Sequence, residues 1–147
     1  MNSTNRFRDE NKVLAAFYDE VWVVCSACSM KAIAKINAET KTVRLFCVHC
    51  GFNKEISTAL GKYGSIQMPA SQFFDADLWL STTFKNELFW AYNSAHLYYL
   101  DRYISAGLRE HKDRTHFALL EKLPKFYQDA KNRDRLLKII KHLKSKG

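Results

Sequence analysis

The sequence contains little glycine and proline and no long hydrophobic run. Its 147 residues include five glycines and two prolines, and the glycines are scattered along the chain. A phosphate-binding loop or a dinucleotide-binding fingerprint needs closely spaced glycines in a fixed pattern, so both are excluded. No apolar stretch approaches the ~20 residues that cross a bilayer, and the first ten residues lack the apolar segment of a secretory signal. We therefore expect a soluble, cytoplasmic protein with no membrane partner.

The composition favours a folded protein whose positive charge is concentrated at one end. Hydrophobic residues make up 47% of the chain and aromatic residues 14%, which is enough for a packed core. The formal net charge is +8. Residues 125–147 contain eight lysines and arginines against two aspartates, whereas residues 61–124 are balanced. The excess charge is thus mainly a C-terminal feature.

The first half of the chain is predicted to be rich in β-strands. A short amphipathic helix is expected over residues 1–20. β-branched and aromatic residues then predict strands over Val21–Cys25, Lys31–Ile36, Thr42–Phe46 and Phe52–Thr58. Residues 59–71, with Gly61, Gly64 and Pro69, read as a linker and the module boundary.

The second half, residues 72–147, is predicted to be a β-hairpin followed by helices. Strands over 77–84 and 87–92 flank the short turn Lys85-Asn86. From Asn93 onward the apolar period becomes helical, with short helical segments expected over 115–122 and from Pro124. A last helix is expected from about 132 to 144, with the buried stripe Leu136, Leu137, Ile140 and Leu143. The expected fold class is α+β, a three-stranded N-terminal ribbon over 21–58 followed by this hairpin and helical unit.

Four cysteines form the motif that carries chemistry. Cys25-x2-Cys28 and Cys47-x2-Cys50 are separated by 18 residues, which is room for a hairpin that brings the two pairs together. Zinc accepts four thiolates tetrahedrally and then has no vacant position for a substrate. Gly51, directly after the last cysteine, suits a tight turn that needs a positive φ. The pattern predicts one structural zinc ion bound by all four cysteines.

The alternative for these cysteines is redox chemistry, as two dithiols or a pair of disulfides. A redox Cys-x-x-Cys is expected singly, in a βαβ setting that this sequence lacks. His49 lies inside the second pair and is expected to point outward, because four sulfurs complete the coordination. No nucleophile elbow or catalytic triad pattern is present, and His96, His111, His116 and His142 are interpreted as surface or satisfied core histidines. We therefore expect a protein that is not an enzyme.

Two features are candidates for a binding surface. Residues 73–103 contain ten of the twenty aromatic side chains, which are either core or, in part, interface anchors. Trp79, Trp90, Tyr98 and Tyr99 are the candidates, and Tyr98 is expected to be the exposed member of its pair. In the last helix, Arg135, Lys138 and Lys141 form a basic face that is either simply solvated or a footprint for an acidic partner.

The sequence also resembles a known group of proteins. Cys25-Ser-Ala-Cys28 and Arg44-Leu-Phe-Cys-Val-His-Cys-Gly51 resemble the two knuckles of a transcription-factor-IIB-type zinc ribbon. The resemblance to small bacterial proteins that contain such a ribbon spans roughly residues 20–143, including Leu78–Leu80, Leu88–Leu97, Leu100–Glu110, Leu123–Phe126 and Ala130–Arg133. It implies a bacterial source and a zinc site but no settled activity. Those proteins carry Cys-Cys-Gly between the two Trp-containing strands, where this chain has Phe84-Lys85-Asn86.

These observations predict a binding module and leave two partner classes open. The aromatic segment is charge-balanced, which favours a protein partner. The resemblance adds neutralisation of an antibacterial toxin, an immunity role, as one concrete form of such binding. The alternative is a nucleic-acid-binding zinc ribbon of the transcription-regulator type, which would carry lysine and arginine interleaved with exposed aromatics.

Overall fold

The computed structural model describes residues 17–106, residue 126 and residues 129–147. The chain forms two compact units, with the division between Asn93 and Ser94. The predicted N-terminal helix lies outside the described residues except for 17–20, which form a turn and the start of a strand. The predicted helical segments over 115–122 and from Pro124 also lie outside them, apart from residue 126.

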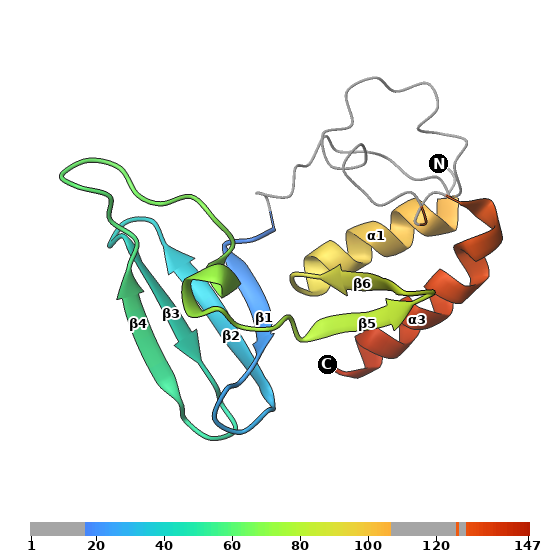
Figure 1. Cartoon of the computed structure of the whole chain (residues 1–147), viewed down its shortest axis with the longest axis horizontal. Helices are drawn as coiled ribbons and strands as arrows, with labels where there is room; N and C mark the ends of the chain where they lie inside the picture. The colour runs from blue at the N-terminus through green and yellow to red at the C-terminus, as the bar shows by residue number, and fades with distance from the viewer. Residues whose placement is uncertain (1–16, 107–125, 127–128) are drawn as a thin grey trace, which may run out of the picture. The chain divides into compact units, whose positions relative to one another are not determined.

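The first unit is built on a four-stranded antiparallel sheet in the order β1-β2-β3-β4 (Figure 1). The strands are β1 (Glu20–Val24), β2 (Lys31–Asn37), β3 (Thr42–Phe46) and β4 (Asn53–Ser57). All four strands were predicted from the sequence. The sheet has four strands and not the three expected for the ribbon, because β1 pairs with β2 along its whole length.

The two faces of this sheet differ as the strand alternation requires. One face is apolar and buried, and consists of Val21, Val23, Ala32, Ala34, Val43 and Leu45. A short 3-10 helix, η2 (Ala70–Phe74), packs against β1, β2 and β3. Its buried residues Ala70 and Ser71 are as small as the alanines of β2, so the helix can lie close to the sheet. The opposite face carries the rows Trp22–Ile33–Phe46 and Glu20–Lys35–Arg44.

A second sheet in the same unit is the hairpin of β5 (Leu80–Phe84) and β6 (Glu87–Ala91). Lys85 and Asn86, both at positive φ, make its two-residue turn, which confirms the hairpin predicted from the sequence. Residues next to this hairpin bond to the outer edge of β1. The amide of Trp22 donates to the Tyr92 carbonyl at 2.7 Å, and its carbonyl accepts from Trp79 at 3.0 Å. The hairpin is therefore joined to the ribbon.

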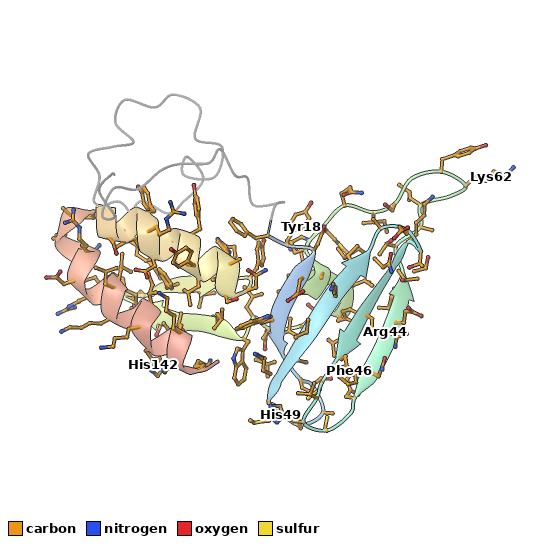
Figure 2. The ribbon with its side chains drawn as sticks, turned by 180° about the vertical axis from the view of Figure 1, so that it is seen from behind. Tyr18, Arg44, Phe46, His49, Lys62 and His142 are labelled. Atoms are coloured by element: carbon orange, nitrogen blue, oxygen red, sulfur yellow. The ribbon has the colours of Figure 1, made fainter. Side chains whose placement is uncertain are left out.

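Residues 59–71, predicted as the linker between modules, lie within this first unit. The Ile66 amide donates to the Thr58 carbonyl at 2.8 Å, and the Leu60 amide donates to the Gly64 carbonyl at 3.2 Å. Lys62 lies at the tip of the resulting loop (Figure 2). The connection is a hydrogen-bonded loop between two parts of one unit.

The second unit contains two packed helices, α1 (Ser94–Ala106) and α3 (Arg133–Ser145), with the 3-10 turn η5 (Ala130–Asn132) before α3. α1 buries Leu97, Leu100 and Ile104 at helical spacing, together with His96, Tyr99 and Tyr103. α3 buries Leu136, Ile140 and Leu143, while Leu137 is half-buried. Within the described ranges, no helix has the length and apolar character needed to cross a membrane.

Candidate metal centre

The strand alternation places the first cysteine of each pair at the edge of the core. Cys25 follows β1 and Cys47 follows β3 in the same parity as the buried residues Val23 and Leu45. Cys25 and Cys47 are accordingly buried, whereas Cys28 is half-buried and Cys50 is exposed. Each strand thus delivers one deep cysteine, and the turn that follows delivers a shallower one.

The two turns that hold the cysteines have the same hydrogen-bond pattern. In the first, the Ser29 amide donates to the Cys25 carbonyl at 2.8 Å and the Cys25 amide donates to the Met30 carbonyl at 2.8 Å. In the second, the Gly51 amide donates to Cys47 at 2.8 Å and the Cys47 amide donates to Phe52 at 2.9 Å. The chain therefore builds two equivalent knuckles, one for each pair.

Both knuckles need a left-handed residue directly after the second cysteine. That residue is Ser29 in the first knuckle, with φ 66°, and Gly51 in the second, with φ 80°. The positive φ predicted for Gly51 is present. The serine adopts the same conformation with a side chain that disfavours it, so the first knuckle is the more strained.

The fold brings the four sulfurs into one cluster. The Sγ atoms of Cys28 and Cys47 are 3.5 Å apart, and those of Cys25 and Cys50 are 3.7 Å apart. All four Sγ atoms lie within 4.8 Å of one another. Four sulfurs placed tetrahedrally at the usual Zn–S length of ~2.3 Å would be about 3.8 Å apart. These two distances are close to the spacing around a four-coordinate ion.

The pKa values of the cysteine thiols also favour a bound cation. Burial opposes ionisation of Cys25, but backbone hydrogen bonds from Cys28 and Ala27 outweigh it and lower the pKa of that thiol to about 7. The Met30 backbone lowers the pKa of Cys28, yet burial and the neighbouring sulfurs raise that pKa to about 12. Hydrogen bonds from the Phe52 backbone and from Cys28 lower the pKa of Cys50. Burial and the sulfurs of Cys25 and Cys47 outweigh them, so the pKa is raised. Four thiolates this close repel one another, so their full ionisation needs a bound cation, and metal binding releases the protons.

The donor set is all sulfur and fits zinc. Soft thiolate ligands at tetrahedral spacing select zinc or iron–sulfur chemistry, and Cys-x2-Cys knuckles are the usual zinc arrangement. The four cysteines can therefore hold one metal ion. His49 is exposed at the knuckle end of the sheet (Figure 2) and does not belong to the four-residue cluster. The structure thus brings together the four ligands predicted from the sequence.

The other residues predicted for binding differ in their accessibility. Tyr99 is buried, and Trp79 and Trp90 are half-buried. Tyr98 is 57% exposed, which confirms that it is the outward member of its pair. Arg135, Lys138 and Lys141 are exposed on α3, next to His142, which projects into solvent (Figure 2).

Three exposed apolar side chains at the knuckles were not predicted. Met30, Phe46 and Val48 are 44%, 42% and 72% exposed and lie at or between the knuckle residues. We call these three side chains the knuckle patch. Strand alternation could have placed Phe46 on the open face, since Val43 and Leu45 take the buried one. The exposure of Met30 and Val48 depends on turn geometry that has no periodic signal.

Of the four histidines interpreted from the sequence, the structure describes His96 and His142. His142 is exposed, and His96 is buried in α1. Burial lowers the pKa of His96 to about 4, so this side chain is neutral near pH 7. His111 and His116 lie outside the described residues.

Comparison with protein-family models, with curated proteins and with solved structures finds no match for this chain.

Proposed function

We propose that this protein is a non-enzymatic binding module stabilised by one structural zinc ion. The observation that carries the proposal is the cluster of four cysteine sulfurs within 4.8 Å of one another. A four-sulfur zinc site is closed, because it leaves no position for water or substrate, and it contributes folding free energy instead. The ion then serves to hold the two knuckles, and the surface they carry, in one geometry.

A protein is the partner that the first unit suits best. Its described residues, 17–93, carry seven basic and seven acidic side chains, so this unit has no charge excess to attract a polyanion. The knuckle patch offers apolar surface on a rigid, metal-held support. Apolar contacts at the centre of a contact area, with few charged groups, are typical of protein interfaces.

Glu20, Lys35, Arg44 and Glu55 form two ion pairs on the open face of the sheet, where the Lys31 ammonium also lies 3.8 Å from the centroid of the Trp22 ring. Lys35 lies 3.9 Å from Glu20, and Arg44 lies 3.3 Å from Glu55 and also donates to Asn53. These pairs lie in the row next to the one that ends in Phe46, and Figure 2 shows Arg44 and Phe46 on this sheet. An apolar row bordered by internally paired charges fits the rim and centre of a protein-binding surface better than a phosphate-binding one. Toxin neutralisation, suggested by the resemblance, is one form that such binding can take.

The zinc assignment is tested by metal analysis of the purified chain. We expect one zinc per chain, and X-ray absorption that shows sulfur ligands only. Less than half an equivalent of zinc, or a mixed nitrogen and sulfur shell, would contradict the proposed site.

The binding role is tested by affinity purification from the native cell after nuclease treatment. We expect a protein to co-elute with the wild type and to be lost with Val48→Ser and Phe46→Ser, two changes at exposed positions that leave the cysteines intact. Tyr63→Ala, at a residue that is 84% exposed on the loop at residues 59–66, is the matched control and should retain the partner. Equal recovery with all variants would exclude the knuckle patch, and turnover of a substrate by the zinc-loaded chain would contradict a non-enzymatic role.

A further inference from the structure

Among the described residues, the net positive charge lies in the helical unit. Among the described residues from 94 onward there are eight lysines and arginines and three aspartates, whereas the first unit is balanced. Two of the aspartates are paired with lysines, Asp101 with Lys144 at 2.5 Å and Asp129 with Lys131 at 3.8 Å. The third, Asp134, is exposed. The helical unit is thus the part of the chain suited to a polyanion.

Four of these basic residues form an oblique ridge on α3. Arg135, Lys138, Lys141 and Lys144 recur at every third position, and all four are exposed. Residues spaced by three form an inclined row on a helix surface, and this row spans about 13 Å of helix length. The row turns by about 60° around the helix axis at each step, so an anionic chain that follows it passes Arg135, Lys138 and Lys141 and reaches Lys144, whose charge is paired with Asp101.

An exposed aromatic ring lies where this ridge ends. The Lys144 ammonium is 5.8 Å from the centroid of the Tyr98 ring, and the Arg102 guanidinium carbon is 5.7 Å from it. More than half of Tyr98 remains accessible at 57% exposure. Asp101 holds Lys144 beside the ring. The ring and the ridge are 37 to 46 residues apart in sequence, from Tyr98 to Arg135 and to Lys144, so only the packing of α1 on α3 brings them together.

We infer that this surface, Tyr98 with the basic ridge, binds single-stranded nucleic acid. Proteins that bind single strands combine cations along the backbone with aromatic side chains on which bases stack, and the stacking is tolerant of sequence. The separation of aromatic and basic segments in the sequence argues for a protein partner, but the fold removes that separation in this unit. The inference goes beyond the proposed protein-binding role, since it concerns a different unit and different residues.

Fluorescence anisotropy of the whole chain with a labelled oligothymidine tests this inference. The oligothymidine has roughly 12 nucleotides, within the usual site size for such binding. We expect binding that weakens steeply with salt. Tyr98→Ala should raise the Kd about tenfold through lost stacking, while Tyr98→Phe, which keeps the ring, should change it less than about twofold. Lys138→Gln and Lys141→Gln should each lower the salt slope by about 0.7, as expected for one lost phosphate contact with a single strand.

Matched controls separate this site from general charge and from the protein-binding role. Lys62→Gln changes an exposed lysine of the neutral unit, and Val48→Ser changes the knuckle patch, and neither should alter oligonucleotide binding. A poly-glutamate peptide and heparin serve as polyanions without bases and should bind more weakly than the oligonucleotide. No binding at low salt, an unchanged Kd for Tyr98→Ala, or a tighter complex with poly-glutamate would overturn the inference, the last in favour of an acidic protein. None of these results bears on the zinc site or on protein capture by the first unit.

Discussion

At the scale of single residues, the two knuckles offer an internal comparison. They share one hydrogen-bond pattern, but the left-handed position is Ser29 in one and Gly51 in the other. Because a residue with a side chain is strained there, Ser29→Gly should raise the free energy of unfolding by roughly 1 kcal/mol and Gly51→Ala should lower it by a similar amount. No atom lies within 4 Å of an added Cβ at Gly51, so the loss would come from the backbone. Urea unfolding at fixed zinc concentration measures both, and a stabilising Gly51→Ala would contradict the geometry.

The buried imidazole of His96 predicts a pH dependence. Its pKa is lowered by burial from 6.5 to about 4, so below pH 6.5 the unfolded chain binds a proton that the folded chain does not. The contribution of neutral His96 to the free energy of unfolding is therefore complete above pH 6.5. It is lost as the pH falls towards 4, by on the order of 3 kcal/mol. NMR titration of the His96 ring protons measures this directly. A His96 that titrates near pH 6.5 in the folded protein would contradict its burial.

Individual site residues were predictable where spacing alone decides their role. The four cysteines and the outward Tyr98 follow from motif spacing and the helical period. His96 and the knuckle patch do not, because their exposure depends on which residues from distant segments cover them. A single sequence contains no local signal for such contacts.

At the scale of elements, alternation and turn chemistry predicted most of the strands. The β5–β6 hairpin depends on a two-residue turn in which Lys85 and Asn86 both have positive φ, 48° and 68°. The η2 helix was missed, because five residues following Pro69 give no helical period to detect. Its place on the sheet depends instead on small residues, such as Ala32 and Ala34, that allow close approach.

The same turn gives a prediction for the hairpin. Asn-Gly is the preferred pair for a two-residue turn with positive φ at both positions, so the double change Lys85→Asn with Asn86→Gly should stabilise the unit by about 1 kcal/mol. Thermal unfolding followed by near-UV circular dichroism measures the change. The single change Lys85→Val, which puts a β-branched residue in the same conformation, is the opposing control and should destabilise. A double variant less stable than wild type would mean that the turn has another geometry.

At the scale of the whole molecule, the division of the chain differs from the sequence expectation of a linker at 59–71. The two units divide between Asn93 and Ser94. The physical reason is the outer edge of β1, where Trp22 bonds to Trp79 and Tyr92. The Asn93 side chain adds hydrogen bonds to the carbonyls of Phe17 and Glu20 at 2.8 and 2.6 Å. Pairing across more than fifty residues leaves no mark in local composition.

This arrangement predicts how far metal removal spreads. Structural zinc contributes on the order of 10 kcal/mol in small zinc-dependent domains, so chelation or Cys47→Ser should unfold the ribbon. Because the hairpin is bonded to β1, the loss of order should extend beyond residue 58 to about Asn93, while α1 and α3 remain partly formed. Hydrogen exchange followed by mass spectrometry, with and without chelator, resolves the two regions. Protection that persists in β5 and β6 without metal would show that the hairpin is stable on its own.

The same edge of β1 has a consequence for synthesis on the ribosome. All four clustered cysteines have been made once Cys50 is added, but the segments that cover the outer edge of β1 follow only with Trp79 and Tyr92. At a translation rate of about 5–20 residues per second, the interval between these points is roughly 2 to 8 seconds. During that interval the valine-rich strand Glu20–Val24 exposes unpaired backbone groups, the kind of edge at which chains aggregate. Early zinc capture would limit this risk by holding the nascent sheet in its native register until the covering segments arrive.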